Sequence, residues 1–377
     1  VIYNTNYTHN PNYYLTLAFE RAAKTVLGDS NVVVADNMSL ADLAAQGEHD
    51  VLICIDGQRI NMELMRRVRP AFKTMIFWAF EDPFMVSFNV DNIGLFDYVF
   101  TNDPSCVDFY QGKGHYLPLA ASLSLHERKV KPAAALDYDI FFAGTMWPNR
   151  VETLRRVITA FPDARIKLVC PGNEYLPPLP ADLADLAIQR PISHEAFIDF
   201  ANASAVTLTM FRDYASHGDV GQATAPGPRF YELGLAGTAQ VVEAGEQLDE
   251  RYIHEVAGAS MSRSVEGVIE HIAALLSNKS LRRKQATAAQ KAVLDAHLYE
   301  HRLQKMMEVT GADFGRHVVS KEISVPARRG RLRVLMCTHS TIHEQAWGGV
   351  EVYQQTIASM LLRDVEFFYW LHRDGMC

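Results

Sequence analysis

Short apolar runs alternate with helix-like segments in the first third of the chain. Between the runs, apolar residues recur every three or four positions, as at Leu15, Phe19, Ala22 and Ala23, which is the spacing of one helix face. Strand-length runs rich in β-branched and aromatic residues occupy residues 1–7, 31–35, 50–55, 74–80, 98–101 and 116–119. Such alternation predicts a parallel sheet covered by helices on both faces.

Residues 122–136 lose this periodicity and gain charge and proline, as an interdomain linker does. The alternation then restarts, and two consecutive helices are expected over 264–309, the last crossing back toward the first domain. The expected strands are 138–143, 165–170, 205–211 and 239–243, with helices beginning near Asn149, Ser193, Pro228 and Gln247. The sequence thus predicts an α/β protein whose two doubly wound parallel-sheet domains, 1–121 and 137–310, face each other across a cleft.

The last part of the chain, residues 311–377, reads as a linker followed by the start of a further α/β domain. A strand is expected over 333–337, and a glycine pair, Gly348 and Gly349, follows it. The pattern stops too early to complete a domain, so we expect it to be the cut-off beginning of one.

The charge, the length of the apolar runs and the cysteine pattern bear on which classes of protein fit this sequence. The 377 residues carry a net charge of -8, which disfavours a nucleic-acid partner because such proteins need a concentrated basic face. The apolar runs are shorter than the roughly 20 residues that span a bilayer. The five cysteines are scattered without a CxxC pair, which predicts buried, reduced thiols as in a cytoplasmic protein.

A glycine-containing turn follows the first strand of the second domain. Gly144, Thr145, Asn149 and Arg150 lie between that strand and the next expected helix. Free N–H groups at a helix start attract phosphate. An ordinary strand-to-helix turn uses glycine and asparagine equally well, so this turn alone leaves both interpretations open.

A short, well-delimited helix is expected over PGPRFYELGLAG, residues 226–237. Proline suits its first position and Gly237 its carboxyl-terminal cap. Arg229 and Glu232 are three residues apart and share a face. A guanidinium suits a diphosphate and a carboxylate suits a ribose diol, although an ordinary ion pair within the helix would have the same spacing.

These segments resemble GT-B glycosyltransferases, especially the group of spore-maturation CgeB-type proteins. In that group an arginine ends a strand and a Pro-x-x-Arg-x-(Phe/Tyr)-Glu helix follows, matched here by Arg212, Arg229, Glu232 and Gly237. Weaker motifs follow in the same order over roughly 70–305: FWAFEDP (77–83), Thr-Asn-Asp (101–103), Leu-Pro-Leu-Ala (117–120) and the segment 297–302. The first 60 residues match only loosely, and so the acceptor stays open.

The resemblance implies a two-Rossmann-domain GT-B fold and a nucleotide-sugar donor, with UDP the expected nucleotide and no cofactor or metal. The diphosphate would lie at Gly144, Arg150, Arg212 and Arg229 and the ribose at Glu232. The whole implied donor site comprises Gly144, Thr145, Asn149, Arg150, Arg212, Gly227, Arg229 and Glu232.

Catalysis by an inverting route would require a general base from the first domain. Glu81 and Asp82 follow a strand end and are the expected catalytic residues, unless one of them only caps the next helix. His9 and Asp56 are second-tier candidates. The retaining route needs no such base, and the sequence leaves the choice open.

The expected function is transfer of a sugar to a glycan, lipid-linked or protein acceptor in bacterial surface-glycan biosynthesis. The expected location is the cytoplasm, with peripheral attachment to the inner face of the membrane left open. Gly348-Gly349-Val350-Glu351 resembles the glycine loop of family 4 glycosyltransferases, which implies a longer, multi-domain transferase, unless the pair is a simple turn. A nucleotide-sugar epimerase of the same fold and a non-catalytic two-domain binding protein are the alternatives.

Overall fold

The computed structural model describes residues 1–4, 13–55, 60–172, 176–212, 222–312 and 314, and the backbone of two strands beyond them. The chain divides into two units, Val1–Val319 and Ser320–Cys377. Each unit is described by itself.

The first sheet of the larger unit has six parallel strands in the order β2-β1-β3-β4-β5-β6. Its strands are β1 (Ile2–Asn4), β2 (Val34–Ala35), β3 (His49–Ile55), β4 (Phe72–Ala79), β5 (Tyr98–Thr101) and β6 (Gly114–Tyr116). Its helices are α1 (Tyr13–Leu27), α2 (Ser39–Ala45), α3 (Met62–Val68) and α4 (Val86–Val90), with 3-10 turns η1 (Asp29–Asn31), η2 (Arg69–Ala71), η3 (Ile93–Leu95) and η4 (Pro104–Tyr110). This sheet and these helices are called the first lobe.

Both faces of this sheet are buried because successive side chains of each strand point to opposite sides. On β3, Ile53 and Ile55 pack under α1, whereas Leu52 and Cys54 pack under α2 and α3. Strands buried on both faces are what the continuous apolar runs of the sequence predict.

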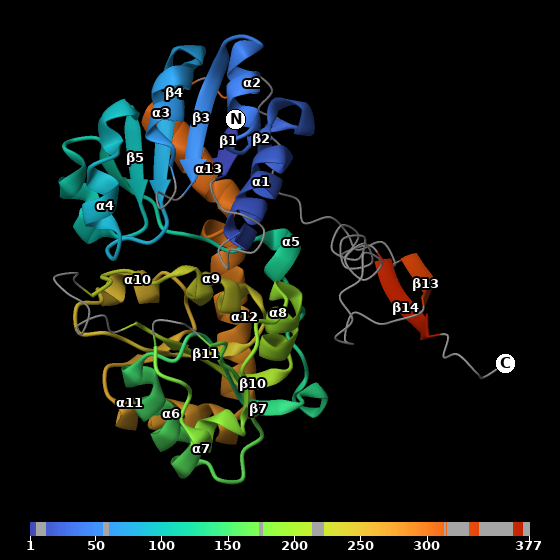
Figure 1. The fold of residues 1–377 in the computed structure, drawn as a ribbon. Helices are drawn as coiled ribbons and strands as arrows, with labels where there is room; N and C mark the ends of the chain where they lie inside the picture. The colour runs from blue at the N-terminus through green and yellow to red at the C-terminus, as the bar shows by residue number, and fades with distance from the viewer. Residues whose placement is uncertain are drawn as a thin grey trace. The chain divides into compact units, whose positions relative to one another are not determined.

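The second sheet also has six parallel strands, in the order β12-β11-β10-β7-β8-β9. Its strands are β7 (Tyr138–Ala143), β8 (Ile166–Val169), β9 (Ala187–Ile188), β10 (Ser204–Met210), β11 (Ala239–Glu243) and β12 (Ser260–Ser262). Its helices are α6 (Pro148–Ala160), α7 (Ala181–Ala184), α8 (His194–Asn202), α9 (Pro228–Leu235), α10 (Glu250–His254), α11 (Val265–Ser277) and α12 (Lys279–Ala296). This sheet and these helices are called the second lobe (Figure 1).

The order of the second sheet reverses between β7 and β10. Helices α6 and α11 cover one face, and α8, α9 and α12 cover the other. In open parallel sheets, ligands bind outside the carboxyl ends of the strands where the order reverses. This rule directs attention to the residues that follow Ala143 and Met210.

Two segments connect the lobes. One contains α5 (Leu123–His126) and η5 (Ala133–Ala135). The other is the last helix, α13 (Tyr299–Thr310), which packs on α1 of the first lobe (Figure 1). The chain therefore returns to its first lobe after completing the second.

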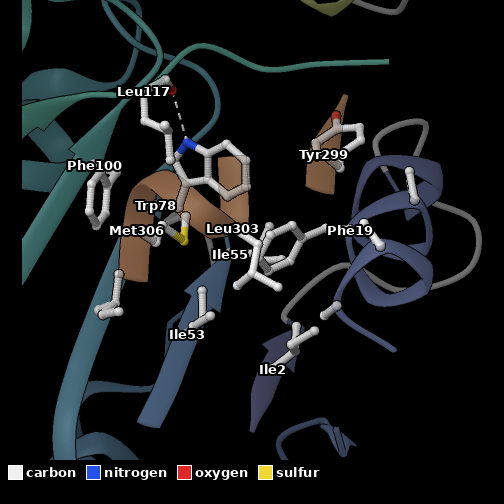
Figure 2. Packing of buried hydrophobic residues seen from close by; sticks show 14 of the residues in the cluster. Ile2, Phe19, Ile53, Ile55, Trp78, Phe100, Leu117, Tyr299, Leu303 and Met306 are labelled. Carbon is white, nitrogen blue, oxygen red and sulfur yellow. Dashed lines mark hydrogen bonds between the residues drawn. The ribbon is translucent and has the colours of Figure 1, made fainter. Parts of the chain in front are cut away.

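Helix α13 packs against an aromatic cluster around Trp78 (Figure 2). The Trp78 ring meets the Phe19 ring edge-on at 5.2 Å, and its Nε1 donates to Leu117 O at 3.1 Å. Leu303 and Met306 of α13 are fully buried in this cluster.

Arg302 fastens the same helix to the chain between the lobes. Its Nε donates to Pro118 O at 2.8 Å and one Nη donates to Ala296 O at 3.1 Å, at the end of α12. The guanidinium thereby joins three segments, which gives a structural reason for the arginine at the end of the 297–302 motif.

Several expected boundaries need correction. The expected strand at 116–119 is wrong, because the chain pairs with β5 at Gly114–Tyr116 instead. Residues 264–309 form three helices, α11, α12 and α13, where two were expected. Asn278 caps the start of α12 because its side chain accepts a hydrogen bond from Leu281 N. Helix α12 ends at Ala296, and α13 begins at Tyr299. The short edge strands β9 and β12 were not expected.

The smaller unit contains two parallel strands, β13 (Leu332–Thr338) and β14 (Val365–Leu371). The expected strand at 333–337 lies within β13. Gly348 and Gly349 lie outside the described residues.

Among the described helices, none combines the length and apolar character needed to cross a membrane.

We predict that Leu303→Ala lowers the free energy of unfolding by about 2 to 5 kcal/mol, because it leaves a cavity under α13. Chemical denaturation measures this loss. Lys305→Ala on the exposed side of the same helix, which removes only a pair with Glu308, should change stability by less than about 1 kcal/mol. Equal effects would contradict the described packing of α13.

Candidate functional site

Helix α9 begins and ends where the sequence predicts. Gly227 is its extended N-cap and Pro228 its first residue. Gly237 follows it with φ +74°, and a Cβ there would lie 2.9 Å from Arg128 O. Gly234 lets α12 approach, since a Cβ would meet Val293 Cγ2 at 2.9 Å. These constraints fix the helix that carries Arg229.

Glu232 of α9 is completely buried. Its Oε1 accepts a hydrogen bond from Tyr14 OH at 2.8 Å, and Tyr14 belongs to the first lobe. Its Oε2 lies 3.6 Å from Arg229 Nη1 and accepts no hydrogen bond within the described structure. Burial raises the pKa of the Glu232 carboxyl, while Arg229 and the Tyr14 hydroxyl oppose the shift. The second oxygen therefore has an ion pair with Arg229 but lacks a hydrogen-bond donor among the described residues.

Arg229 lies beside this carboxylate and stacks on an aromatic ring. Its guanidinium is 4.0 Å from the centre of the Phe197 ring, and its side chain is 36% exposed. The pair expected from the sequence therefore forms, but as one buried group and one partly accessible group at a contact between the lobes.

Arg150 spans the point where the strand order reverses. Its Nη1 donates to Thr145 O at 2.8 Å and its Nη2 donates to Met210 O, which joins the ends of β7 and β10. Burial, followed by the charges of Arg212 and Arg229, lowers the pKa of Arg150 to about 9. The charges of Arg212 and Arg229 thus act on Arg150, while Arg212 pairs with Glu81 and Arg229 with Glu232. Positive charge concentrated in this way suits an anion.

Gly144 leaves room for Arg150. A Cβ at Gly144 would lie 3.2 Å from Arg150 Nη1 and 3.2 Å from Phe142 Cζ. Its own N–H donates to Val169 O at 3.0 Å. The N–H of Gly144 is therefore used within the second lobe, and the absence of a side chain at Gly144 leaves room for Arg150. Its place in the donor site stays a prediction.

Arg212 follows β10 and pairs with the first lobe. Its Nη2 lies 2.9 Å from Glu81 Oε2, and its guanidinium lies 4.5 Å from the centre of the Phe84 ring. Of the two candidate general bases, Glu81 and Asp82, Glu81 is therefore the one that contacts the second lobe.

Asp82 has the opposite environment. It is 1% exposed, and it accepts hydrogen bonds from Asn89 Nδ2 at 3.0 Å, Thr101 Oγ1 at 2.7 Å and Tyr110 OH at 2.5 Å. Burial raises its pKa, against the effect of these donors. This environment is that of a structural acceptor inside the first lobe. The catalytic role expected for Asp82 stays a prediction.

Among the contacts between the lobes that were not predicted, two more are hydrogen bonds to carboxylates. One is Tyr14 to Glu232, described above. In the other, Asp103 of the first lobe accepts from Thr224 N at 2.7 Å and from Ser105 Oγ at 2.7 Å. Asp103 and Pro104 follow β5, and an Asp-Pro pair after a strand indicates a helix N-cap. No local sequence pattern indicates that Asp103 also has a partner in the second lobe. His9 and Asp56 lie outside the described residues.

A cluster of His126, His194 and Glu232 has ligand atoms within 4.8 Å of one another. Ser122 N donates to His126 Nδ1 at 2.9 Å, so Nδ1 is the acceptor and His126 Nε2 carries the proton toward His194 Nε2. A metal ligand needs the lone pair that this proton occupies. Burial, followed by Arg229 and Arg128, holds the pKa of His194 well below its usual range. The cluster is built as a neutral hydrogen-bonded pair rather than a metal site.

Two cavities border the second sheet. The larger, about 530 Å³, is lined by Asp139, Arg165 and Arg282 and lies at the amino ends of β7 and β8. The smaller, about 200 Å³, lies at the carboxyl ends of β10 and β11 and includes Asn149 and Arg212 in its wall. Only the smaller cavity contains residues of the predicted site.

Residues 133–308 match the model of a family described as glycosyl transferase-like. This segment holds β7 to most of α13 and is similar to that family over a little less than half of the chain. A comparison with curated proteins finds no match to the sequence.

Solved structures resemble the chain in fold. An α-glucosyltransferase in complex with UDP and a 13-mer DNA containing an HMU base aligns with TM-score 0.59 at 12% identity, over 82% of this chain and 98% of its own. A protein assigned as a UDP-N-acetylglucosamine 2-epimerase from Listeria monocytogenes aligns with TM-score 0.51 at 11% identity, over 82% and 94%. The N-terminal domain of Candida albicans trehalose-6-phosphate phosphatase gives 0.51 at 11%, over 72% of each chain. The two parallel six-stranded sheets therefore have the GT-B fold.

We predict that Asp82→Ala destabilises the protein by about 3 kcal/mol, because three buried donors lose their acceptor. Chemical denaturation measures the loss. Glu81→Ala, which removes a partly exposed ion pair, should cost about 1 kcal/mol or less. An unchanged stability in Asp82→Ala would contradict the structural role and leave Asp82 as a candidate base.

Proposed function

We propose that this protein is a glycosyltransferase that moves a sugar from a nucleoside diphosphate to an acceptor hydroxyl. The observation that carries the proposal is the group of three cations, Arg150, Arg212 and Arg229, at the carboxyl ends of β7 and β10. A diphosphate is a ligand whose charge and oxygens suit these guanidiniums, two of which pair with Glu81 and Glu232 in the described structure. The GT-B fold and the similarity to the glycosyl transferase-like family support this assignment.

Arg212 and Arg229 contact the diphosphate in this proposal. Both are partly exposed, at 34% and 36%. Arg150 donates through both Nη atoms to backbone carbonyls, so it contributes charge and holds the Gly144 turn in place. Fixed cations of this kind stabilise the charge that develops on the leaving diphosphate.

Glu232 binds the ribose of the donor. Its Oε2, which accepts no hydrogen bond from the described residues, accepts one ribose hydroxyl, and the second hydroxyl takes the place of Tyr14 at Oε1. A buried carboxylate that receives hydroxyl donors regains the hydrogen bonds that its burial removed.

Glu81 is the proposed general base. The acceptor oxygen attacks the anomeric carbon, the bond from that carbon to the diphosphate oxygen breaks, and Glu81 takes the acceptor proton. Arg212 bonds Glu81 in the described structure, so the donor diphosphate and Glu81 compete for one guanidinium. Donor binding thereby releases the base for catalysis.

The finer assignment is a CgeB-type transferase that uses UDP-sugars without a cofactor or metal and acts on a glycan, lipid-linked or protein acceptor in surface-glycan assembly. The motifs at Arg212, Arg229 and Glu232 support this. Peripheral attachment to the membrane and a second, family 4-like transferase after residue 320 belong to the same proposal.

The epimerase alternative shares the fold, as the Listeria protein illustrates. The two activities differ in their products, since an epimerase returns an isomeric nucleotide sugar whereas a transferase releases the free nucleotide. Product analysis after incubation with UDP-sugars separates them.

We predict that Glu232→Gln weakens UDP binding about 10-fold or more, because a charged acceptor of the ribose hydroxyls is lost. Isothermal titration measures the change. Glu270→Gln, on an exposed surface of α11, is the matched control and should bind as the wild type does. Unchanged affinity in Glu232→Gln would remove the ribose assignment. If neither UDP, GDP nor dTDP binds the wild type, the donor site itself is refuted.

We predict that Glu81→Gln lowers the transfer rate by about 100-fold or more without weakening UDP binding, because the base is lost while Arg212 is released. Steady-state turnover at a fixed pH measures this loss, and titration with UDP checks that donor binding is kept. Asp91→Asn, an exposed carboxylate of the same lobe, should retain full turnover. Full turnover by Glu81→Gln would indicate a route without this base.

A further inference from the structure

The cavity of about 200 Å³ lies directly beside the proposed diphosphate site. It is bordered by the start of α6, the end of β10 and the chain after β11. Its lining residues are Asn149, Phe211, Arg212, Gln222, Ala223 and residues 243–246. Arg212 therefore belongs both to the cavity wall and to the proposed diphosphate site. Whatever group is joined to the diphosphate lies next to this space.

Three buried acceptor atoms occur in the wall. Asn149 Oδ1, Gln222 Oε1 and Glu243 Oε2 receive no hydrogen bond from the residues that the structure describes. The Asn149 amide orientation is fixed, because its Nδ2 donates to Phe211 O at 3.0 Å. Glu243 is also held, since Thr153 Oγ1 donates to its Oε1 at 2.5 Å. Leaving such acceptors unpaired is unfavourable, so the wall is suited to a ligand that brings donors.

The backbone leaves room for these groups. A Cβ at Gly245 would lie 3.0 Å from Gln222 Oε1, so any side chain at this position would displace the amide. Glu246 adds a second carboxylate to the lining. Apart from Arg212, the wall is rich in acceptors and acidic, which selects a neutral group with several hydroxyls.

We propose that this cavity is the subsite for the sugar ring of the donor, with Glu243, Asn149 and Gln222 accepting hydrogen bonds from its hydroxyls. The inference rests on the proposed function, because Arg212 must hold the diphosphate for the sugar to reach this space. The cavity volume is about 200 Å³, which suits a small group rather than an oligosaccharide. The acidic lining selects an uncharged sugar over a uronic acid.

The test compares binding of UDP with binding of UDP-glucose, UDP-galactose and UDP-N-acetylglucosamine to the wild type and to Glu243→Gln. The variant keeps an oxygen toward Thr153 but loses the charged acceptor. We expect the tightest UDP-sugar to bind about 10-fold more weakly to the variant, while UDP affinity changes by less than about two-fold. Gln222→Ala should show the same selectivity with a loss of about five-fold, and Glu270→Gln should show no change.

The outcomes separate the two proposals. Equal losses for UDP and UDP-sugars, or no loss for either, would overturn the sugar subsite while leaving the nucleotide site in place. Absence of UDP, GDP and dTDP binding by the wild type would overturn the proposed function and with it the subsite. A melting temperature close to that of the wild type excludes a purely structural effect of Glu243→Gln.

The proposed preference of the acidic lining for an uncharged sugar over a uronic acid is measured separately. UDP-glucuronate should bind the wild type at least about 10-fold more weakly than UDP-glucose, and Glu243→Gln should narrow this gap. A wild type that binds both equally would overturn the assignment of an uncharged sugar.

Discussion

The fully buried carboxylate of Glu232 lies where the two lobes meet, and it fixes the positions of Arg229 and Tyr14 around it. Glu232 is held there by a short helix whose ends are fixed by Gly227, Pro228 and Gly237. Its burial raises its pKa, so keeping it ionised costs stability that a hydrophobic residue would not. Natural proteins keep such groups mainly where function needs them, and a hydroxyl-bearing ligand supplies the missing donors.

Three polar contacts that the first lobe makes with this region use groups that also suit a ligand. Tyr14 donates to the carboxylate of Glu232, Glu81 pairs with the guanidinium of Arg212, and Asp103 accepts from the N–H of Thr224. The hydroxyl of Tyr14 thus occupies a position suited to a ribose hydroxyl. The carboxylates of Glu81 and Asp103 occupy positions suited to phosphate oxygens. Donor binding in the proposed mechanism is therefore an exchange of partners that loosens the contact between the lobes.

The fold was predictable from the sequence because its signals are local. The bounds of β5, β7 and β11 and the start of α9 agree with the apolar runs and the Pro-Gly punctuation. The site was predictable only in part. Asp82 and Glu81 are neighbours with the same chemistry, and only tertiary packing makes the first a buried structural acceptor and the second a partner of Arg212. Tyr14 precedes its partner by 218 residues, a distance over which a single sequence carries no pairing signal.

The most direct test of the central claim is a comparison of UDP with 2′,3′-dideoxy-UDP by titration, in the wild type and in Glu232→Gln. If Glu232 accepts the ribose hydroxyls, removing them weakens binding to the wild type by about 10-fold or more but has little further effect on the variant. The same penalty in both proteins would contradict the account, because the hydroxyls would then be recognised elsewhere.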